Sequence, residues 1–396
     1  MHKPLHGIRV LEFGNLIAAP YAGMLLADLG ADVVKIEPTS GDLGRGFGPF
    51  VGGESAFFMA ANRGKRSLAC SPKDPRVQQW LQRLVVGADA LIHNLRLGSM
   101  ERMGLGEDDV RAMKPEIVYA TVSAFGSTGP DAGRPGIDVV FQGESGMISL
   151  TGHDGDPPQK TATTIGDYVA ATNTALAVCA ALVGPDRGRR VDVALRDGLL
   201  AVQSGWSALF FANGQQPVRT GTASPFLAPN QVFVTADGHL TLAIVSDSHF
   251  RILCESIDRS DLAESYPTNS ERMASRDDLV AELTRIFVTQ PTDHWVELFR
   301  DVGLPSGRVL DLDDVFSNPQ VAHNEMVYEY EHPAAGRTRA VGSPLQIDGE
   351  SSRSGLPPPL LGQHGREILD ELGASQDEIE DLIRDKIIAE PQAGSS

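Results

Sequence analysis

The sequence predicts an α/β protein, with a large domain built on a parallel sheet and a smaller α+β domain. Two observations lead to this fold class. Apolar, strand-like segments alternate with helical patterns through the first part of the chain, and this pattern changes near Pro225. Because strands that alternate with helices form a parallel sheet covered on both faces, the large domain is expected to be a Rossmann-like open fold.

The expected elements of the large domain follow one another closely. IRVLEF (Ile8–Phe13) is an apolar run of strand length, and PYAGMLLADLG (Pro20–Gly30) reads as a helix with Pro in its first turn and Gly at its end. ADVVKIE (Ala31–Glu37) predicts the second strand. Two further strands are expected at Ala88–Leu95 and Glu116–Gly126. The turn after the first strand lacks the GxGxxG pattern, so a nucleotide-dependent dehydrogenase is not predicted.

The segment TIGDYVAATNTALAVCAAL carries the most informative residue, Asp167. A strand-like stretch there meets a helix of small residues, and we expect Asp167 to be the N-cap of this helix. The helix dipole would then keep its carboxylate ionised. Gly166, directly before it, allows another molecule to approach closely. An Asp in such a place is more often a structural cap, so its catalytic role depends on the rest of the chain.

A smaller α+β domain is predicted from the change of pattern near Pro225. Asn230–Asp247 reads as a hairpin with its turn at Asp237-Gly238, and helical patterns follow. Strand character returns at Glu325–His332, and two short acidic helices are expected within Gly365–Ile388. The expected domains are residues 1–224 for the first part of the large domain, 225–320 for the small domain, and 321–396 for the return to the large domain with the C-terminal helices.

Composition excludes several classes of function. Hydrophobic residues make up 41% and charged residues 22% of the chain, as in ordinary globular proteins. The net charge of −18 argues against binding to nucleic acid or to an anionic membrane. The longest apolar stretches are broken by Gly, Asp or Arg, so no membrane-spanning helix is expected. No signal core is visible, and the 3 cysteines form no CxxC pair. A cytoplasmic protein is therefore expected. The 10 histidines show no HxxxH or HExxH spacing, so no metal site is expected.

Several segments, taken in order along nearly the whole chain, resemble the family III CoA-transferases, the CaiB/BaiF group. The segments are ADLGADVVKIEP (Ala27–Pro38), ANRGKRSLA (Ala61–Ala69), IHNLRLGSMERMGLG (Ile92–Gly106), SAFGSTGP (Ser123–Pro130) with RPGIDVVFQGESGMISLTG (Arg134–Gly152), and the Asp167 segment with RGRRVDVALRDGLL (Arg187–Leu200). The resemblance implies that Asp167 attacks an acyl-CoA thioester. An aspartyl-acyl anhydride and then an aspartyl-CoA thioester would form, and CoA would pass to a carboxylic acid acceptor.

The resemblance also implies the binding residues and the assembly. Asn94 and Arg102 match positions that hold the nucleotide end of CoA, and Lys73 with the stretch Cys70–Pro72 matches the segment that lines the adenine. Ala18 matches a position near the thioester. CoA and acyl-CoA would be substrates, with no tightly bound cofactor and no metal. The family architecture is an interlocked homodimer, in which both chain ends complete the large domain.

The chain departs from the family pattern at two places. Ile17 stands where some members carry a Gln near the reacting carbonyl. A basic residue that some members use for the 3′-phosphate is replaced near Pro135, and the neighbouring Arg134 is a candidate to serve instead.

Two alternatives to a transferase remain open from the sequence. An acyl-CoA racemase of the same fold needs a second proton carrier, typically a His before the Asp of the string Gly136-Ile137-Asp138, and Ile cannot transfer a proton. A non-catalytic CoA-binding protein could keep Asp167 as a structural cap. The transferase is favoured over both, with succinyl-CoA and a dicarboxylic or branched acid as the expected substrates. Residues around Phe226–Asn230 are expected to select the acid.

Overall fold

The computed structural model describes residues 3–391, which form two compact units. The first unit consists of Met1–Met147, Lys160–Ala208 and Pro319–Ser396, and the second of Ile148–Gln159 and Leu209–Asn318. The short segment 148–159 joins the second unit because His153 forms an isolated β-bridge with Thr220 and the Gly221 N–H donates to the Gly152 carbonyl. The second unit thus includes residues from before 225.

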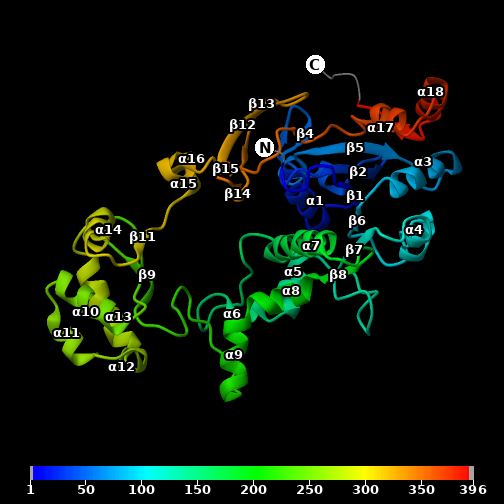
Figure 1. Ribbon diagram of the computed structural model, residues 1–396. Coiled ribbons are helices and arrows are strands. Elements are labelled where there is room, and N and C mark those ends of the chain that lie inside the picture. The colour runs from blue at the N-terminus through cyan, green and yellow to red at the C-terminus, as the bar shows by residue number, and fades with distance from the viewer. Residues whose placement is uncertain (1–2, 392–396) are drawn as a thin grey trace. The chain divides into compact units, whose positions relative to one another are not determined.

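A seven-stranded sheet forms the centre of the first unit (Figure 1). Its order is β16-β5-β2-β1-β6-β7-β8, and all neighbours are parallel except β16 and β5. The strands are β1 (Arg9–Phe13), β2 (Asp32–Pro38), β5 (Lys65–Cys70), β6 (Ala90–His93), β7 (Val118–Ser123), β8 (Arg190–Ala194) and β16 (Ile388–Ala389). Numbered along the chain, the parallel strands follow the order 3-2-1-4-5-6 of a doubly wound sheet.

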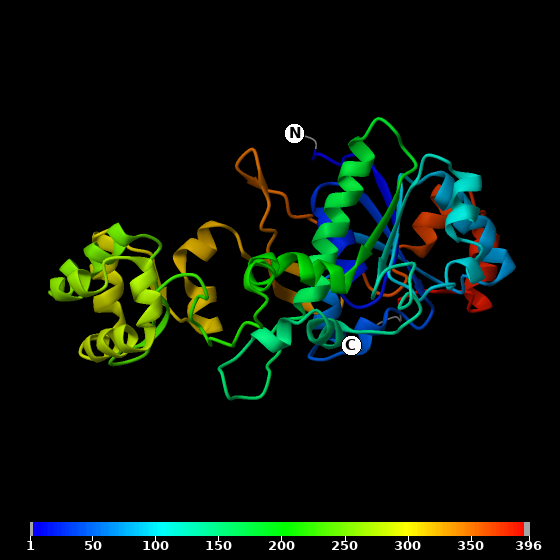
Figure 2. The ribbon, with the colours of Figure 1, turned by 90° about the horizontal axis from the view of Figure 1, so that it is seen from below.

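Helices cover both faces of this sheet (Figure 2). On one face lie α1 (Ala18–Asp28) and α7 (Ile165–Val183), which pack on Val10, Val33 and Ile92. On the other lie α3 (Pro75–Val86), α4 (Glu107–Met113), α17 (Gly365–Glu371) and α18 (Gln376–Arg384), which pack on side chains of the opposite alternation, such as Leu11 and Val34. Strands buried on both faces explain why their sequences are almost continuously apolar.

By length and composition alone, α7 could cross a membrane. In the structure, its small residues Ala170, Ala171, Thr174 and Ala175 are buried, and the helix packs against α1, β7 and β8. Small side chains let two helices approach closely, so the apolar character of α7 is that of a helix packed inside a domain.

The C-terminal segment returns to the first unit. The short strand β16 pairs with β5, and α17 and α18 add Ile368, Leu369, Ile379 and Leu382 to the core. The two acidic helices predicted within 365–388 are therefore present. The strand expected at Glu325–His332 is also present, as β12 (Val327–His332), but it pairs with β13 (Gly336–Val341) in a separate two-stranded sheet.

The second unit is an antiparallel sheet with helices. The predicted hairpin is present as β9 (Asn230–Val234) and β10 (His239–Ala243), and β11 (Ser306–Arg308) completes the sheet. Its core includes Phe233, Phe250, Phe287 and Phe299. The helices are α10 (Asp247–Ser256), α11 (Ser260–Ser265), α12 (Asn269–Ala274), α13 (Arg276–Phe287), α14 (Thr292–Asp301) and α15 (Leu312–Ser317).

The remaining elements are short, and several border the site described below. They are the 3₁₀ helices η1 (Leu43–Gly46) and η2 (Glu101–Met103), the helices α2 (Ala56–Met59), α5 (Asp138–Glu144), α6 (Met147–Leu150), α8 (Leu195–Val202), α9 (Ser204–Asn213) and α16 (Pro319–His323), and the strands β3 (Phe50–Val51), β4 (Glu54–Ser55), β14 (Gln346–Ile347) and β15 (Glu350–Ser351).

A buried ionic network joins the strands β1, β2 and β5. The carboxylate of Glu12 accepts hydrogen bonds from Lys35 at 2.9 Å and from Lys65 at 2.6 Å, and all three side chains are 0% exposed. Burial alone would raise the pKa of Glu12, but the two lysines outweigh it and lower that pKa to about 2. Glu12 is therefore ionised at neutral pH, as a buried charge with partners can be.

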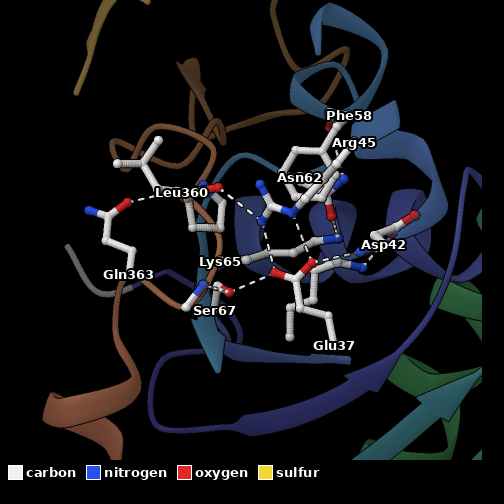
Figure 3. A network of polar contacts seen from close by, with 12 residues as sticks. Glu37, Asp42, Arg45, Phe58, Asn62, Lys65, Ser67, Leu360 and Gln363 are labelled. Atoms are coloured by element: carbon white, nitrogen blue, oxygen red, sulfur yellow. Dashed lines mark hydrogen bonds and ion pairs between the residues drawn. The ribbon is translucent and has the colours of Figure 1, made fainter. Parts of the chain in front are cut away.

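The network extends from the strands to Arg45 and Asn62, which lie in the segments that connect β2 to β5 (Figure 3). Glu37 accepts hydrogen bonds from Arg45 at 2.8 Å and from Ser67 at 2.6 Å, and Lys65 donates to Asn62 at 2.6 Å. Lys35 also donates to the carbonyl of Gly14, the first residue after β1, at 2.9 Å. The network thus holds the start of the loop that follows β1.

Candidate active site

A cavity of about 1090 Å³ lies in the first unit, beyond the carboxyl ends of β1, β6 and β7. Its walls come from the loop after β1, the segment 93–103 after β6, the segment 121–127 ending β7, and the first turns of α5 and α7. The chain runs outwards in opposite directions from β1 and β6, so the two loops diverge and leave a crevice between them. Doubly wound sheets bind their ligands at this point.

Most of the site residues predicted from the sequence line this one cavity. They are Ala18, Lys73, Asn94, Arg102 and Asp167. Cys70 is the exception, because its side chain is 0% exposed in the core at the end of β5, opposite Ile388 of β16. Burial raises the pKa of its thiol to about 12. The Cys70 side chain therefore contributes nothing to this cavity.

Asp167 is not the N-cap of α7, and that prediction was wrong. The cap residue is Thr164, and Asp167 is the third residue of the helix. The N–H of Gly166 instead donates to Oδ1 of Asp138, on α5, at 2.8 Å. Since Asp138 supplies the acceptor that a capping side chain would supply, Asp167 is left out of the capping interaction.

The carboxylate of Asp167 is half-buried and has no hydrogen-bond or ion-pair partner among residues 3–391. Burial raises its pKa to about 7, and the negative charge of Asp138 acts in the same direction. The effects of burial and of the Asp138 charge on this pKa therefore outweigh any effect of the helix dipole. When ionised, a carboxylate of such basicity is a better nucleophile than an ordinary Asp carboxylate. With a pKa of about 7, it is still substantially ionised at neutral pH.

Asn94 fixes the loop after β1 across the crevice. Its Oδ1 accepts from the N–H of Asn15 and its Nδ2 donates to the carbonyl of Asn15, both at 2.9 Å. The N–H of Leu16 donates to Asp42 at 3.0 Å, and Leu16 has a φ of 65°. A non-glycine residue adopts this left-handed conformation only when its surroundings enforce it. Ile17 is buried below the loop and does not line the cavity.

One wall of the cavity carries basic side chains that lack acidic partners. Lys73, Arg96 and Arg102 form no ion pair among the described residues, and Arg102 makes one side-chain hydrogen bond, to Ser99 at 2.8 Å. Unpaired cations in a chain of net charge −18 create a local positive potential. This wall can therefore attract a polyanion that the rest of the surface repels.

The other arginines of the cavity are paired with acids. Arg134 bonds Glu144 at 2.6 Å and Asp131 at 3.2 Å. Arg190 bonds Asp192 at 2.6 Å and Glu107 at 2.8 Å. These pairs leave little free positive charge on Arg134, so the structure gives no support to Arg134 as a replacement phosphate contact.

Sequence reasoning missed Asp138, Gln142 and His93. Asp138 and Gln142 are spaced four apart, which places both on one face of α5, and this spacing was the available signal. His93 is the single histidine among the described residues that line the cavity. Its Nε2 lies 3.1 Å from Oγ1 of Thr121, and burial lowers the pKa of its ring to about 4. Ile137, where a racemase would carry its proton donor, is exposed at the cavity wall.

Comparison with known proteins shows which family the chain belongs to. The model of CoA-transferase family III matches residues 5–365. The chain belongs to this family. The chain is 35% identical over 377 residues to the succinyl-CoA:glutarate CoA-transferase of Mus musculus, covering 93% of this chain and 86% of that protein. It is 34% identical over 382 residues to the succinyl-CoA:mesaconate CoA-transferase of Haloarcula marismortui, covering 93% and 96%.

A solved structure has the same fold. A CaiB/BaiF family protein from Brucella suis matches with a TM-score of 0.82 and 31% identity, covering 94% of this chain and 100% of that chain. The protein is thus a family III CoA-transferase, an enzyme whose substrates are CoA thioesters, as the sequence analysis predicted. The racemase and the non-catalytic binding protein are the less favoured alternatives.

The raised pKa of Asp167 predicts that this residue destabilises the fold at alkaline pH. Since its pKa is higher in the folded state, stability falls as pH rises from its ordinary value of 3.8 to about 7. Asp167→Asn should therefore raise the free energy of unfolding at pH 8 by up to about 4 kcal/mol, because the pKa rises from 3.8 to about 7 and one pKa unit corresponds to about 1.4 kcal/mol. The gain should shrink towards zero near pH 4. Thermal denaturation across this pH range measures it.

The control is Asp301→Asn, at a side chain that is 76% exposed. This variant should show no such pH-dependent gain. Equal stability of the parent and Asp167→Asn at pH 8 would contradict the assignment of a raised pKa.

Proposed function

We propose that this enzyme transfers CoA from an acyl-CoA thioester, with succinyl-CoA as a donor, to a carboxylic acid, and that Asp167 is the nucleophile. One observation carries the proposal: an unpartnered carboxylate of raised pKa shares a cavity with three unpaired cations. A carboxylate needs no partner base to attack a thioester, because it already carries the reacting electron pair. Orientation and charge stabilisation are what the site must supply.

The reaction proceeds through covalent states of Asp167. Its carboxylate attacks the thioester carbonyl, the C–S bond breaks, and an aspartyl-acyl anhydride and CoA thiolate form. The thiolate attacks the aspartyl carbonyl, which releases the donor acid and leaves an aspartyl-CoA thioester. The acceptor carboxylate then attacks the carbonyl of this thioester and expels CoA thiolate, which gives a second anhydride between Asp167 and the acceptor. The thiolate attacks the acceptor carbonyl of this anhydride and releases the Asp167 carboxylate. The products are the new acyl-CoA and free Asp167, without net consumption of protons.

The start of α1 is suited to stabilise the oxyanion of these steps. Ala18, its first residue, lines the cavity, and the helix has neither a capping side chain nor an acidic residue in its first turn. The N–H groups of a helix start attract negative charge. We assign the backbone of Ala18 and Ala19 to this role. The loop before them is held by Lys35, Asp42 and Asn94.

The basic wall is proposed to hold the phosphates of CoA, with Lys73 and Arg102 as its main contacts and Arg96 beside them. Asn94 would act mainly through the loop that it holds. Two relatives are named for succinyl-CoA with glutarate or mesaconate, which supports a dicarboxylic acid as the acceptor. Selection of the acid by residues 226–230 stays a prediction.

The assembly proposed is a cytoplasmic, interlocked homodimer with a Rossmann-like large domain. Exposed apolar residues support it: α9 has no buried side chain, and Phe211 is 80% exposed. On α7, Leu176 is 68% and Val183 is 85% exposed. Large apolar surfaces of this kind are usually covered by a partner, and a second copy is the commonest one.

The nucleophile is tested with Asp167→Asn. An amide is a poor nucleophile towards a thioester, so CoA exchange between succinyl-CoA and labelled acid should fall by roughly 10³-fold or more. CoA affinity, measured by calorimetry, should stay within about twofold, since the cavity keeps its shape and its basic wall. Substantial exchange by this variant would refute the role of Asp167.

The basic wall is tested with Arg102→Ala. Loss of a charge-assisted contact to a phosphate costs about 1.5–3 kcal/mol, so the KM for acyl-CoA should rise about tenfold or more with little change in kcat. The KM of the parent should also increase with salt concentration. The matched control is Arg285→Ala, at a 71% exposed arginine of the second unit. An unchanged KM in Arg102→Ala would show that this residue does not contact CoA.

The assembly is tested by sedimentation velocity. An interlocked dimer cannot separate without partial unfolding, so a dimer should persist down to the lowest micromolar concentrations. Phe211→Glu should reduce the yield of folded dimer, because it would bury an unpaired charge in the interface. A well-folded monomer of the parent chain would disprove the interlocked arrangement.

A further inference from the structure

Helix α5 carries a pair of polar side chains directed at the start of α7. The carboxylate of Asp138 is 6% exposed and Gln142 is 0% exposed. Oδ1 of Asp138 accepts the N–H of Gly166 at 2.8 Å, and Oδ2 accepts Nε2 of Gln142 at 2.5 Å. Both oxygens of this buried carboxylate are thus engaged by neutral donors.

Gln142 extends the contact to the segment that leads into α7. Its Nε2 also donates to the carbonyl of Thr163 at 3.3 Å. Its Oε1 accepts the N–H of Thr161 at 2.9 Å and the Thr161 hydroxyl at 3.2 Å. One carboxamide therefore fixes the backbone at residues 161 and 163, directly before the N-cap of α7.

The approach of Asp138 to this backbone depends on Gly166. A Cβ at Gly166 would lie 2.9 Å from Oδ1 of Asp138 and 3.2 Å from Cδ1 of Leu199. The carboxylate is therefore packed directly against the residue that precedes Asp167, and the absence of a side chain there makes this possible.

The charge of Asp138 is not needed for capping alone. Asn or Ser caps a helix as well as Asp does, and a neutral residue avoids the cost of burying a carboxylate. Among residues 3–391, Asp138 forms no ion pair that would offset this cost. A buried, unpaired negative charge beside the catalytic helix therefore requires another explanation.

We propose that Asp138 is a positioning residue for Asp167, which both fixes the first turn of α7 and, through its buried charge, keeps the Asp167 carboxylate a strong nucleophile. The proposal rests on the proposed role of Asp167. Because Asp138 accepts the N–H of Gly166, that N–H does not bond to Asp167. A hydrogen bond to the Asp167 carboxylate would lower its basicity and make it a weaker nucleophile. The charge of Asp138 is one of the two causes that raise the pKa of Asp167.

Other groups near the first turn of α7 do not provide the same effect. Helix α8, which packs on α7, carries Arg196, but this guanidinium is paired with Asp197 at 3.3 Å and with Asp131 at 3.6 Å. Tyr168 follows Asp167 on α7, and α1 brings Tyr21, whose ring contacts that of Tyr168 with centroids 4.8 Å apart. Asp138 is the one charged group among the described residues whose field raises the proton affinity of Asp167.

The test compares two variants by their pH profiles of kcat/KM. Asp138→Asn removes the charge and keeps an acceptor for the Gly166 N–H, so the acid limb should move to lower pH by about one unit. The plateau value of kcat should fall by at most about tenfold, since a carboxylate that is less basic by about one pKa unit attacks more slowly. Gln142→Ala removes the contacts to residues 161–163 but keeps the charge. It should lower kcat without moving the acid limb.

In Asp138→Asn, the new NH2 group would face the NH2 group of Gln142, and two donors in contact destabilise the fold. Asp138→Ser avoids this contact, because its hydroxyl oxygen can accept from the Gly166 N–H and from Gln142 without carrying a charge, and it should show the same direction of shift. An acid limb that stays in place in the folded Asp138 variants, while Asp167→Asn is inactive, would overturn the proposal and leave the role of Asp167 intact. Activity of Asp167→Asn would instead overturn the proposed function itself.

Discussion

The hydrogen bond from the Gly166 N–H to Asp138 is the interaction on which the site depends. A helix start needs an acceptor for its free N–H groups, and the side chain of the N-cap residue normally supplies it, but Thr164 makes no such bond. Here the acceptor comes from α5, so the carboxylate of Asp167 is left unbonded inside the cavity. Its pKa rises because it is half-buried next to a second carboxylate, and the fold bears the cost of this arrangement.

The sheet topology explains why residues far apart in the sequence meet at one cavity. The loops after β1 and β6 diverge at the centre of a doubly wound sheet, and their conformations must be held open. Asn94 ties the two loops together through the backbone of Asn15, and Lys35 holds Gly14 from inside the core. The buried ionic network is thus part of the support of the site as well as of the fold.

Local patterns predicted the fold well where contacts are local. The strands β1, β2, β6 and β7 were evident from apolar runs, whereas β5 and β8 were not, because KRSLAC and RVDVA contain charges. In β5 these charges are paired across the sheet, Lys65 with Glu12 and Arg66 with Asp32. The N-cap prediction was wrong because the side chain that accepts the N–H of Gly166 belongs to Asp138, which lies 28 residues earlier in the sequence. The burial of Cys70 depends on β16, at the other end of the chain.

The most direct test of the account is to identify the residue that carries the covalent intermediate. The enzyme is incubated with acyl-CoA without acceptor, trapped with borohydride or hydroxylamine, digested, and analysed by peptide mass spectrometry. The account predicts a modification at Asp167, in the peptide that spans the start of α7, and its absence without acyl-CoA. A modification at another residue, or stoichiometric turnover with an unmodified Asp167, would contradict it.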